Sequence, residues 1–138
     1  MKSILKTRSF AAAAAAFLTA GAASAAPPSN LAGTTWTVQA NREVSQLVIT
    51  SQGGPGAPGA ATCRHIFGTI GSAAIRGWYC PSTGRVHFQH VNAGITARAF
   101  TGNVSDDVAG QTLYMGGTMA VLDANFGNYG EYNFSAIN

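Results

Sequence analysis

Few side chains in this 138-residue chain could do chemistry, and its three histidines are the first to consider. His87 and His90 are three residues apart, so on a strand they point to opposite faces and cannot hold one metal ion together. His65 could approach His87 only across strands, and no carboxylate or free thiolate is placed to complete a zinc set. We therefore predict no metal site and expect half-exposed histidines that pack on Trp78.

The carboxylates and serines have no catalytic arrangement either. Asp106 and Asp107 are adjacent in an expected turn, so their side chains diverge instead of facing one substrate as paired acid–base catalysis requires. Ser82 and Ser135 lack the Gly-x-Ser-x-Gly context of a nucleophile elbow. The glycine-rich stretch 53–59 lacks the Lys of a phosphate-binding loop. We predict no catalytic residues and no cofactor, so a binding protein is more expected than an enzyme.

The N-terminal segment 1–25 has the form of a secretory signal peptide. A positively charged start precedes an uncharged, largely apolar run from Phe10 to Ala20, and Ala23-Ser24-Ala25 is a small-x-small cleavage pattern. We place the cut after Ala25, with Ala26 as the near alternative. The apolar run is about half of the ~20 residues that span a bilayer, so no membrane anchor is expected. A secreted or periplasmic location follows from this interpretation.

Removal of the signal peptide changes the charge balance. The formal net charge of +3 comes from three basic residues within 1–25. The remaining chain has five arginines and five acidic residues: Arg42, Arg64, Arg76, Arg85, Arg98, Glu43, Asp106, Asp107, Asp123 and Glu131. A phosphate-binding surface needs clustered excess Lys or Arg, so we predict no nucleic-acid partner.

The elements that must position these side chains are all predicted to be strands. Eight β-like runs alternate with turn residues, and no helix is expected after residue 25. The runs are Thr34–Ala40, Ser45–Thr50, Thr62–Ile70, Ala73–Tyr79, Arg85–Val91, Ile95–Val104, Gln111–Leu122 and Tyr129–Ile137. Short sequential links favour an all-β, eight-stranded antiparallel meander closed into an up-and-down barrel, with a β-sandwich as the alternative. Residues 26–32 are expected to be a flexible lead, 33–138 the single barrel domain and 51–61 a mobile loop.

The two cysteines define one strand register. Gly71-Ser72 suits a type II′ hairpin, which would pair residues whose numbers sum to 143. Cys63 and Cys80 share that sum, and they fall at a non-hydrogen-bonded pair, where Cα atoms come closest. The exported compartment permits a disulfide, which would stabilise the fold by roughly 3 kcal/mol in the chain-entropy treatment. Two separate buried thiols are the alternative.

The same register assigns side chains to the two faces of this hairpin. The face toward the core would carry Ile66, Ile70, Ile75 and Tyr79, and the outer face would carry His65, Phe67, Arg76 and Trp78. If the turn Pro81–Gly84 keeps the next pairs at a sum near 165, His87 lies beside Trp78 in a row His65–Trp78–His87. A bulge in that turn would shift this row by one residue.

Two short motifs and the strand count resemble the calycin-type small barrels, especially the avidin-like group. Trp36 follows Gly33-Thr34-Thr35 at the start of the first run, as a Gly and a Trp do in those families. Phe100-Thr101-Gly102 looks like the aromatic-hydroxyl-Gly strand of avidins. The resemblance implies an eight-stranded barrel. It does not extend to biotin, because Asn41 and Ser45 lie too far from Trp36 and the run 111–122 contains no Trp.

Arg98 is the charged residue of greatest interest, because it lies inside a run with Phe100. An inward Arg would be costly unless it met an anion or an internal carboxylate, so the outward orientation is favoured.

We therefore expect an exported, non-catalytic binding protein that holds a small, largely apolar ligand in the mouth of the barrel. An apolar wall with a polar anchor suits such a ligand. The expected ligand-binding residues are Trp36, Trp78, Tyr114 and Arg98. The alternative is a protein-binding domain, such as an inhibitor of an exported enzyme, or an envelope-structural domain. It would use the loop 53–61 or the His65/Trp78 surface to contact another exported protein.

Overall fold

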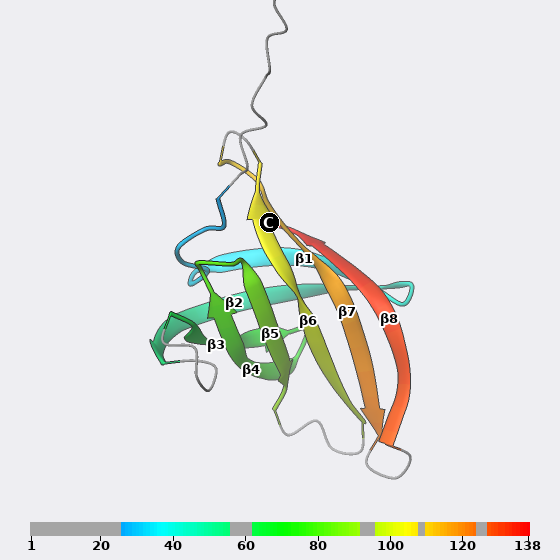
Figure 1. Cartoon of the computed structure of the whole chain (residues 1–138). Coiled ribbons are helices and arrows are strands. Elements are labelled where there is room, and N and C mark those ends of the chain that lie inside the picture. Colours follow the sequence, from blue (N-terminus) through cyan, green and yellow to red (C-terminus); the bar gives the residue numbers. More distant parts are fainter. Residues whose placement is uncertain (1–25, 56–61, 92–95, 108–109, 124–126) are drawn as a thin grey trace, which may run out of the picture.

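Eight antiparallel strands form one closed barrel in which each strand pairs with the next and the last returns to the first (Figure 1). The structure, a computed structural model, describes residues 26–55, 62–91, 96–107, 110–123 and 127–138. The strands are β1 (Thr34–Ala40), β2 (Glu43–Pro55), β3 (Arg64–Ile70), β4 (Ala73–Cys80), β5 (Arg85–His90), β6 (Thr96–Asp106), β7 (Leu113–Asp123) and β8 (Gly127–Ile137). The predicted meander barrel is confirmed. Within the described ranges, no helix is long and apolar enough to cross a membrane.

The predicted register of the β3–β4 hairpin is confirmed residue by residue. Ile70 pairs with Ala73 and Arg64 with Tyr79, so every pair sums to 143. Gly71 has a φ of 57°, the left-handed value that the first position of a type II′ turn requires. Cys63 and Cys80 form a disulfide, with Cα atoms 4.0 Å apart. The next pairing also follows its prediction, because all β4–β5 pairs sum to 165.

Apolar side chains fill the interior of the barrel. The hairpin residues that were expected to face inward are all buried, as are Trp36 and Val38 of β1. Phe88 and Phe100 stack with ring centroids 4.7 Å apart, and Phe134 meets Phe100 edge-on at 5.3 Å. Among the described residues, no polar or charged residue is fully buried. The interior is therefore a continuous apolar core, which aromatic side chains fill with good packing geometry.

The second strand is longer than expected. Residues 51–55, which we assigned to a mobile loop, continue β2 and pair with β3. Two register shifts, after Ile49 and after Gly53, let this glycine-rich segment bend while it stays paired. Gly54, inside the second shift, has a φ of 67°. The glycine-rich composition does not predict a strand, because glycine weakens regular pairing and is tolerated at bulges. The rest of the expected loop, 56–61, lies outside the described residues.

The segment 26–32, expected to be a flexible lead, contacts one end of the barrel. The side chain of Leu31 is fully buried, and its backbone N–H donates to the Oε1 atom of Gln52 over 2.9 Å. The phenol of Tyr79 donates to the carbonyl of Pro28 over 2.6 Å. These contacts lay the segment over the end of the barrel that holds Tyr79 (Figure 1).

Glycines allow neighbouring strands to approach closely at inward-facing positions. At Gly77 of β4, an added Cβ would overlap the carbonyl oxygen of His87 on β5. At Gly68 of β3, it would overlap the carbonyl oxygen of Val48 on β2. Because both contacts are with backbone, no side-chain rotation could relieve them. These glycines are therefore places where the sheet bends sharply to close the barrel.

Gly77→Ala should lower the free energy of unfolding by about 2 kcal/mol or more, because the new methyl group forces β4 and β5 apart. Gly53→Ala is the matched control: no atom lies within 4 Å of the position that its added Cβ would take, and we expect a change within about 0.5 kcal/mol. Urea denaturation of both variants measures the difference. Equal effects of the two substitutions would contradict the close approach at Gly77.

Tyr79 should make the fold sensitive to alkali. Burial, with a smaller contribution from the Asp106 carboxylate, raises the pKa of Tyr79 to about 12. An unfolded tyrosine ionises near pH 10, so the stabilisation is complete below about pH 10 and is lost as the pH rises through the folded value. Between about pH 9 and 11, Tyr79 should account for a loss of about 1 kcal/mol in unfolding free energy. Tyr79→Phe should remove this component, whereas the exposed control Tyr114→Phe should retain it.

Candidate functional site

The four residues predicted to bind a ligand lie in four different places. Trp36 is fully buried in the core, and its indole N–H donates to the Thr34 hydroxyl over 2.7 Å. Trp78 is half-buried on the outside of β4. Tyr114 lies on β7 with 45% of its surface exposed. Arg98 lies beside Glu43 at the end of the barrel near the β1–β2 turn, opposite the end at which Tyr79 contacts Pro28. The structure does not bring these side chains together.

Arg98 faces inward, so the outward orientation that we favoured is wrong. It lies two residues from the buried Phe100, on the same face of β6, and contributes to the same small cavity as Val38 and Met119. Its guanidinium forms an ion pair with Glu43 of β2 at 2.6 Å. The Glu43 side chain is 54% exposed and that of Arg98 33%, so the pair lies at the rim of the barrel. Because the ion pair keeps contact with water, the inward Arg98 avoids the cost of a buried, unpaired charge.

The barrel end beside this ion pair is almost closed. The cavity that Arg98, Glu43 and the neighbouring core residues line has a volume of about 10 Å³, no more than a single water molecule needs. His90 of β5 is on the same inner face as Phe88, and its pKa is lowered by burial and then by the charge of Arg98. His90 and His87 thus point to opposite faces, as their spacing predicted.

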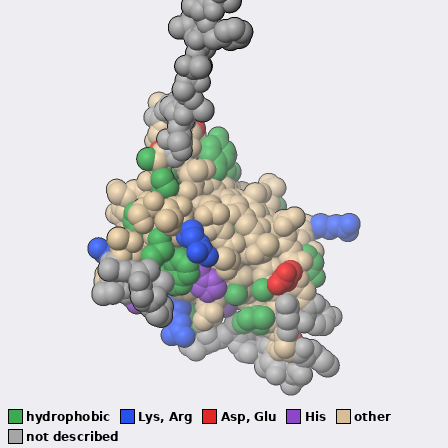
Figure 2. All heavy atoms as spheres, viewed as in Figure 1, with side chains coloured by type: hydrophobic (Ala, Val, Ile, Leu, Met, Phe, Trp, Pro, Cys, Tyr) green, Lys and Arg blue, Asp and Glu red, His purple; other side chains and the backbone are tan. Residues whose placement is uncertain are grey.

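A larger groove lies on the outside of the barrel across β3, β4 and β5. Its volume is about 310 Å³, and we call it the aromatic groove. The residues that line it are His65, Phe67, Arg76, Gly77, Trp78, His87 and Gln89. Figure 2 shows Arg and His side chains beside hydrophobic ones over this part of the barrel.

Two rows of paired residues build the aromatic groove. In one row, Trp78 of β4 pairs with His65 of β3 and with His87 of β5. In the other, Arg76 is flanked in the same way by Phe67 and Gln89. The first row is the one expected from the hairpin register. Gln89 carries no sequence signal of a functional role, although the sum of 165 pairs it with Arg76.

Stacking and hydrogen bonding hold the floor of the aromatic groove in place. The rings of Trp78 and His87 stack with centroids 5.8 Å apart and planes inclined by 28°. The Nδ1 atom of His87 is 2.9 Å from the hydroxyl of Thr101 on β6. Burial lowers the pKa of His87. Arg76 contributes a fixed positive charge to the aromatic groove, because a guanidinium stays protonated at physiological pH.

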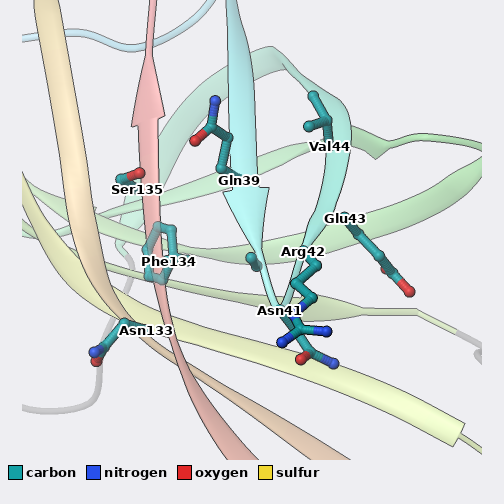
Figure 3. Close-up of a pocket in the computed structure, with 9 residues that line it drawn as sticks. Gln39, Asn41, Arg42, Glu43, Val44, Asn133, Phe134 and Ser135 are labelled. Atoms are coloured by element: carbon teal, nitrogen blue, oxygen red, sulfur yellow. The ribbon is translucent and has the colours of Figure 1, made fainter.

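A second depression lies between the β1–β2 turn and β8 (Figure 3). β1 turns back after Ala40, whereas β8 continues beyond Phe134, the residue with which Ala40 pairs, so the sheet has a step here. The depression at this step has a volume of about 480 Å³. Figure 3 shows polar side chains from both sides of this step, Asn41 and Arg42 on the turn and Asn133 on β8. Its aromatic residue, Phe134, is buried and offers little surface to a ligand. The aromatic groove is therefore the better candidate site.

Comparison of the chain with family models, with curated proteins and with solved structures gave no match. Among the described residues, no three His, Cys, Asp or Glu side chains are grouped to hold a metal ion. The functional interpretation therefore depends on the geometry of the aromatic groove.

The two tryptophans should respond differently to a quencher in solution. Trp36 is fully buried, whereas Trp78 forms part of an open groove. Trp78→Phe should therefore remove most of the acrylamide-quenchable emission and leave the shielded emission of Trp36. Tyr114→Phe, which alters an exposed aromatic side chain elsewhere, should leave quenching unchanged. Undiminished quenching in Trp78→Phe would contradict the outward position of Trp78.

Proposed function

We propose that this chain is an exported, non-catalytic binding protein whose partner, another exported protein, docks on the aromatic groove. The single observation that carries the proposal is that the barrel interior is filled by its core, while an open aromatic surface lies on the outside. Export rests on the signal-peptide pattern of residues 1–25. The closed eight-stranded meander is compatible with a calycin-like barrel, and that relationship is part of the proposal.

The interior argues against a ligand in the barrel mouth. Pockets for small molecules usually measure about 300–1,000 Å³, far more than the cavity of about 10 Å³ beside Arg98. At the opposite end, the buried side chains of Leu31 and Tyr79 lie beneath the segment that precedes β1. A ligand in either place would have to displace core side chains.

The composition of the aromatic groove favours a protein partner. Trp and Arg are enriched among the residues that carry most of the binding energy at protein interfaces, and here Trp78 and Arg76 are neighbours on β4. Phe67, 47% exposed, extends the apolar area beside them. These side chains project from paired strands, so little of their backbone has to become ordered on binding.

A small planar apolar molecule is the second candidate. The volume of the aromatic groove, about 310 Å³, lies at the lower end of the range for small-molecule sites. Such a molecule would stack on Trp78 without needing a protein behind it.

Selection of peptides from a random library displayed on phage, with the folded chain from Ala26 onward as target, tests the proposal. Enriched peptides should lose most of their affinity for Trp78→Ala and for Phe67→Ala. They should bind Tyr114→Ala as they bind the wild type, because that exposed aromatic side chain lies outside the aromatic groove. Peptides that bind all variants equally, or no enrichment at all, would overturn the protein-binding role. Anilinonaphthalene sulfonate binding that depends on Trp78, without enriched peptides, would favour the small-molecule alternative.

A further inference from the structure

We propose that the aromatic groove recognises an extended, acidic segment of its partner in which a carboxylate and an aromatic side chain are two residues apart. The carboxylate would pair with Arg76 and the aromatic ring would pack on Trp78. This inference rests on the proposed function and specifies the chemistry of the partner.

The spacing of Arg76 and Trp78 on β4 sets the spacing of the acidic and aromatic residues that a partner must present. Arg76 and Trp78 are two residues apart on β4 and lie on the same outer face. Side chains at positions i and i+2 of any extended chain share a face and are about 6.8 Å apart. A partner strand running over β4 therefore presents matching groups only when its acidic and aromatic residues are separated by one residue. Adjacent residues would point to opposite faces.

Arg76 is available for an external carboxylate. Among the described residues, its guanidinium has no ion-pair partner, whereas Arg98 is neutralised by Glu43. Its cross-strand neighbours are Phe67 and Gln89, neither of which carries charge. A carboxylate brought to Arg76 would therefore gain a charge-assisted hydrogen bond without competing with an internal one.

The charge distribution around the aromatic groove favours an acidic partner. The sequences of β3, β4 and β5 contain three arginines, at 64, 76 and 85, and no Asp or Glu. The carboxylates of the described strands lie elsewhere, at Glu43, Asp106, Asp123 and Glu131. Arg76 and Arg85 are in the outward register with Trp78, whereas Arg64 pairs with Tyr79 in the inward register. The outer face of these strands therefore carries two arginines and no carboxylate, and complementary charge guides association and orientation.

Trp78 provides the surface for the aromatic ring of the partner. One neighbour, His87, is stacked on it and fixes the orientation of the indole, while His65 lies on the other side in the same row. An additional ring can pack against this row in an offset-stacked or edge-on arrangement, both of which are favourable for aromatic side chains.

The test uses synthetic peptides acetylated and amidated at their ends, with Thr at all other positions. The first contains Glu-Thr-Phe, the second Gln-Thr-Phe, and the third Glu-Phe with the two residues adjacent. Binding is followed by the fluorescence of the wild-type chain from Ala26 onward, because the peptides contain no Trp and Trp36 is buried. We expect the first peptide to bind at least about fivefold more tightly than the other two, and its affinity to fall as the salt concentration is raised.

Charge reversal on the protein distinguishes a specific ion pair at Arg76 from a general electrostatic attraction to the positive surface. Arg76→Glu should lower the affinity for the first peptide by about tenfold and leave the affinity for the second almost unchanged. Arg85→Glu makes the same change of net charge on β5, outside the residues that line the aromatic groove, and should weaken the first peptide by no more than about twofold. Circular dichroism of both variants confirms that the barrel is intact.

The outcomes distinguish this inference from the function on which it rests. Equal binding of the three peptides, or equal effects of the two arginine substitutions, would overturn the acidic-x-aromatic inference. Peptides selected from the library that need Trp78 but contain no such pattern would do the same and leave the protein-binding function standing. Absence of any Trp78-dependent peptide, from the library or the synthetic set, would overturn both.

Discussion

The pairing of β3 with β4 in a single register decides which side chains of this hairpin enter the core and which face outward. A slip of one residue would exchange every inward side chain of this hairpin for an outward one. Ile66 and Tyr79 would then leave the core, and Trp78 would enter it. The type II′ turn at Gly71 and the disulfide between Cys63 and Cys80 hold opposite ends of the hairpin, so both must agree on this register. The register that places the inward side chains in the core also places the side chains of the aromatic groove on the outside.

The filling of the barrel determines where binding can occur. Large side chains alternate with glycines on the inner face, so Ile66 lies opposite Gly77 and Ile75 lies opposite Gly68. This matching lets the strands curve closely around Phe88 and Phe100, and the interior is packed rather than hollow. A barrel of this kind serves as a rigid support, and side chains that project outward from neighbouring strands can act as one surface.

The two ends of the barrel are closed by different physical means. At one end, an arginine that would be unfavourable alone is neutralised by Glu43, and the pair retains contact with water. At the other, the segment before β1 supplies a buried leucine and the carbonyl of Pro28, which satisfies the buried phenol of Tyr79. Each closure joins residues far apart in the chain, so neither follows from local sequence. The aromatic groove on the outside of β3, β4 and β5 is the surface that we propose for a partner.

Sequence patterns predicted the strand order, the meander barrel, the disulfide and the row His65–Trp78–His87, and the structure confirms each of them over the alternatives. These follow from local turn geometry and from the period of two, which act between neighbouring strands. Three features became visible only in the folded chain: Arg98 faces inward, β2 continues to Pro55, and the cavity beside Arg98 measures only about 10 Å³. The orientation of Arg98 depends on Glu43, which is distant in the sequence and meets it across the barrel. The free volume depends on all inward side chains at once, so no single strand reveals it. The row that builds the aromatic groove could therefore be predicted from the sequence, whereas our proposal that the groove binds a partner in place of the barrel mouth depends on the packed interior.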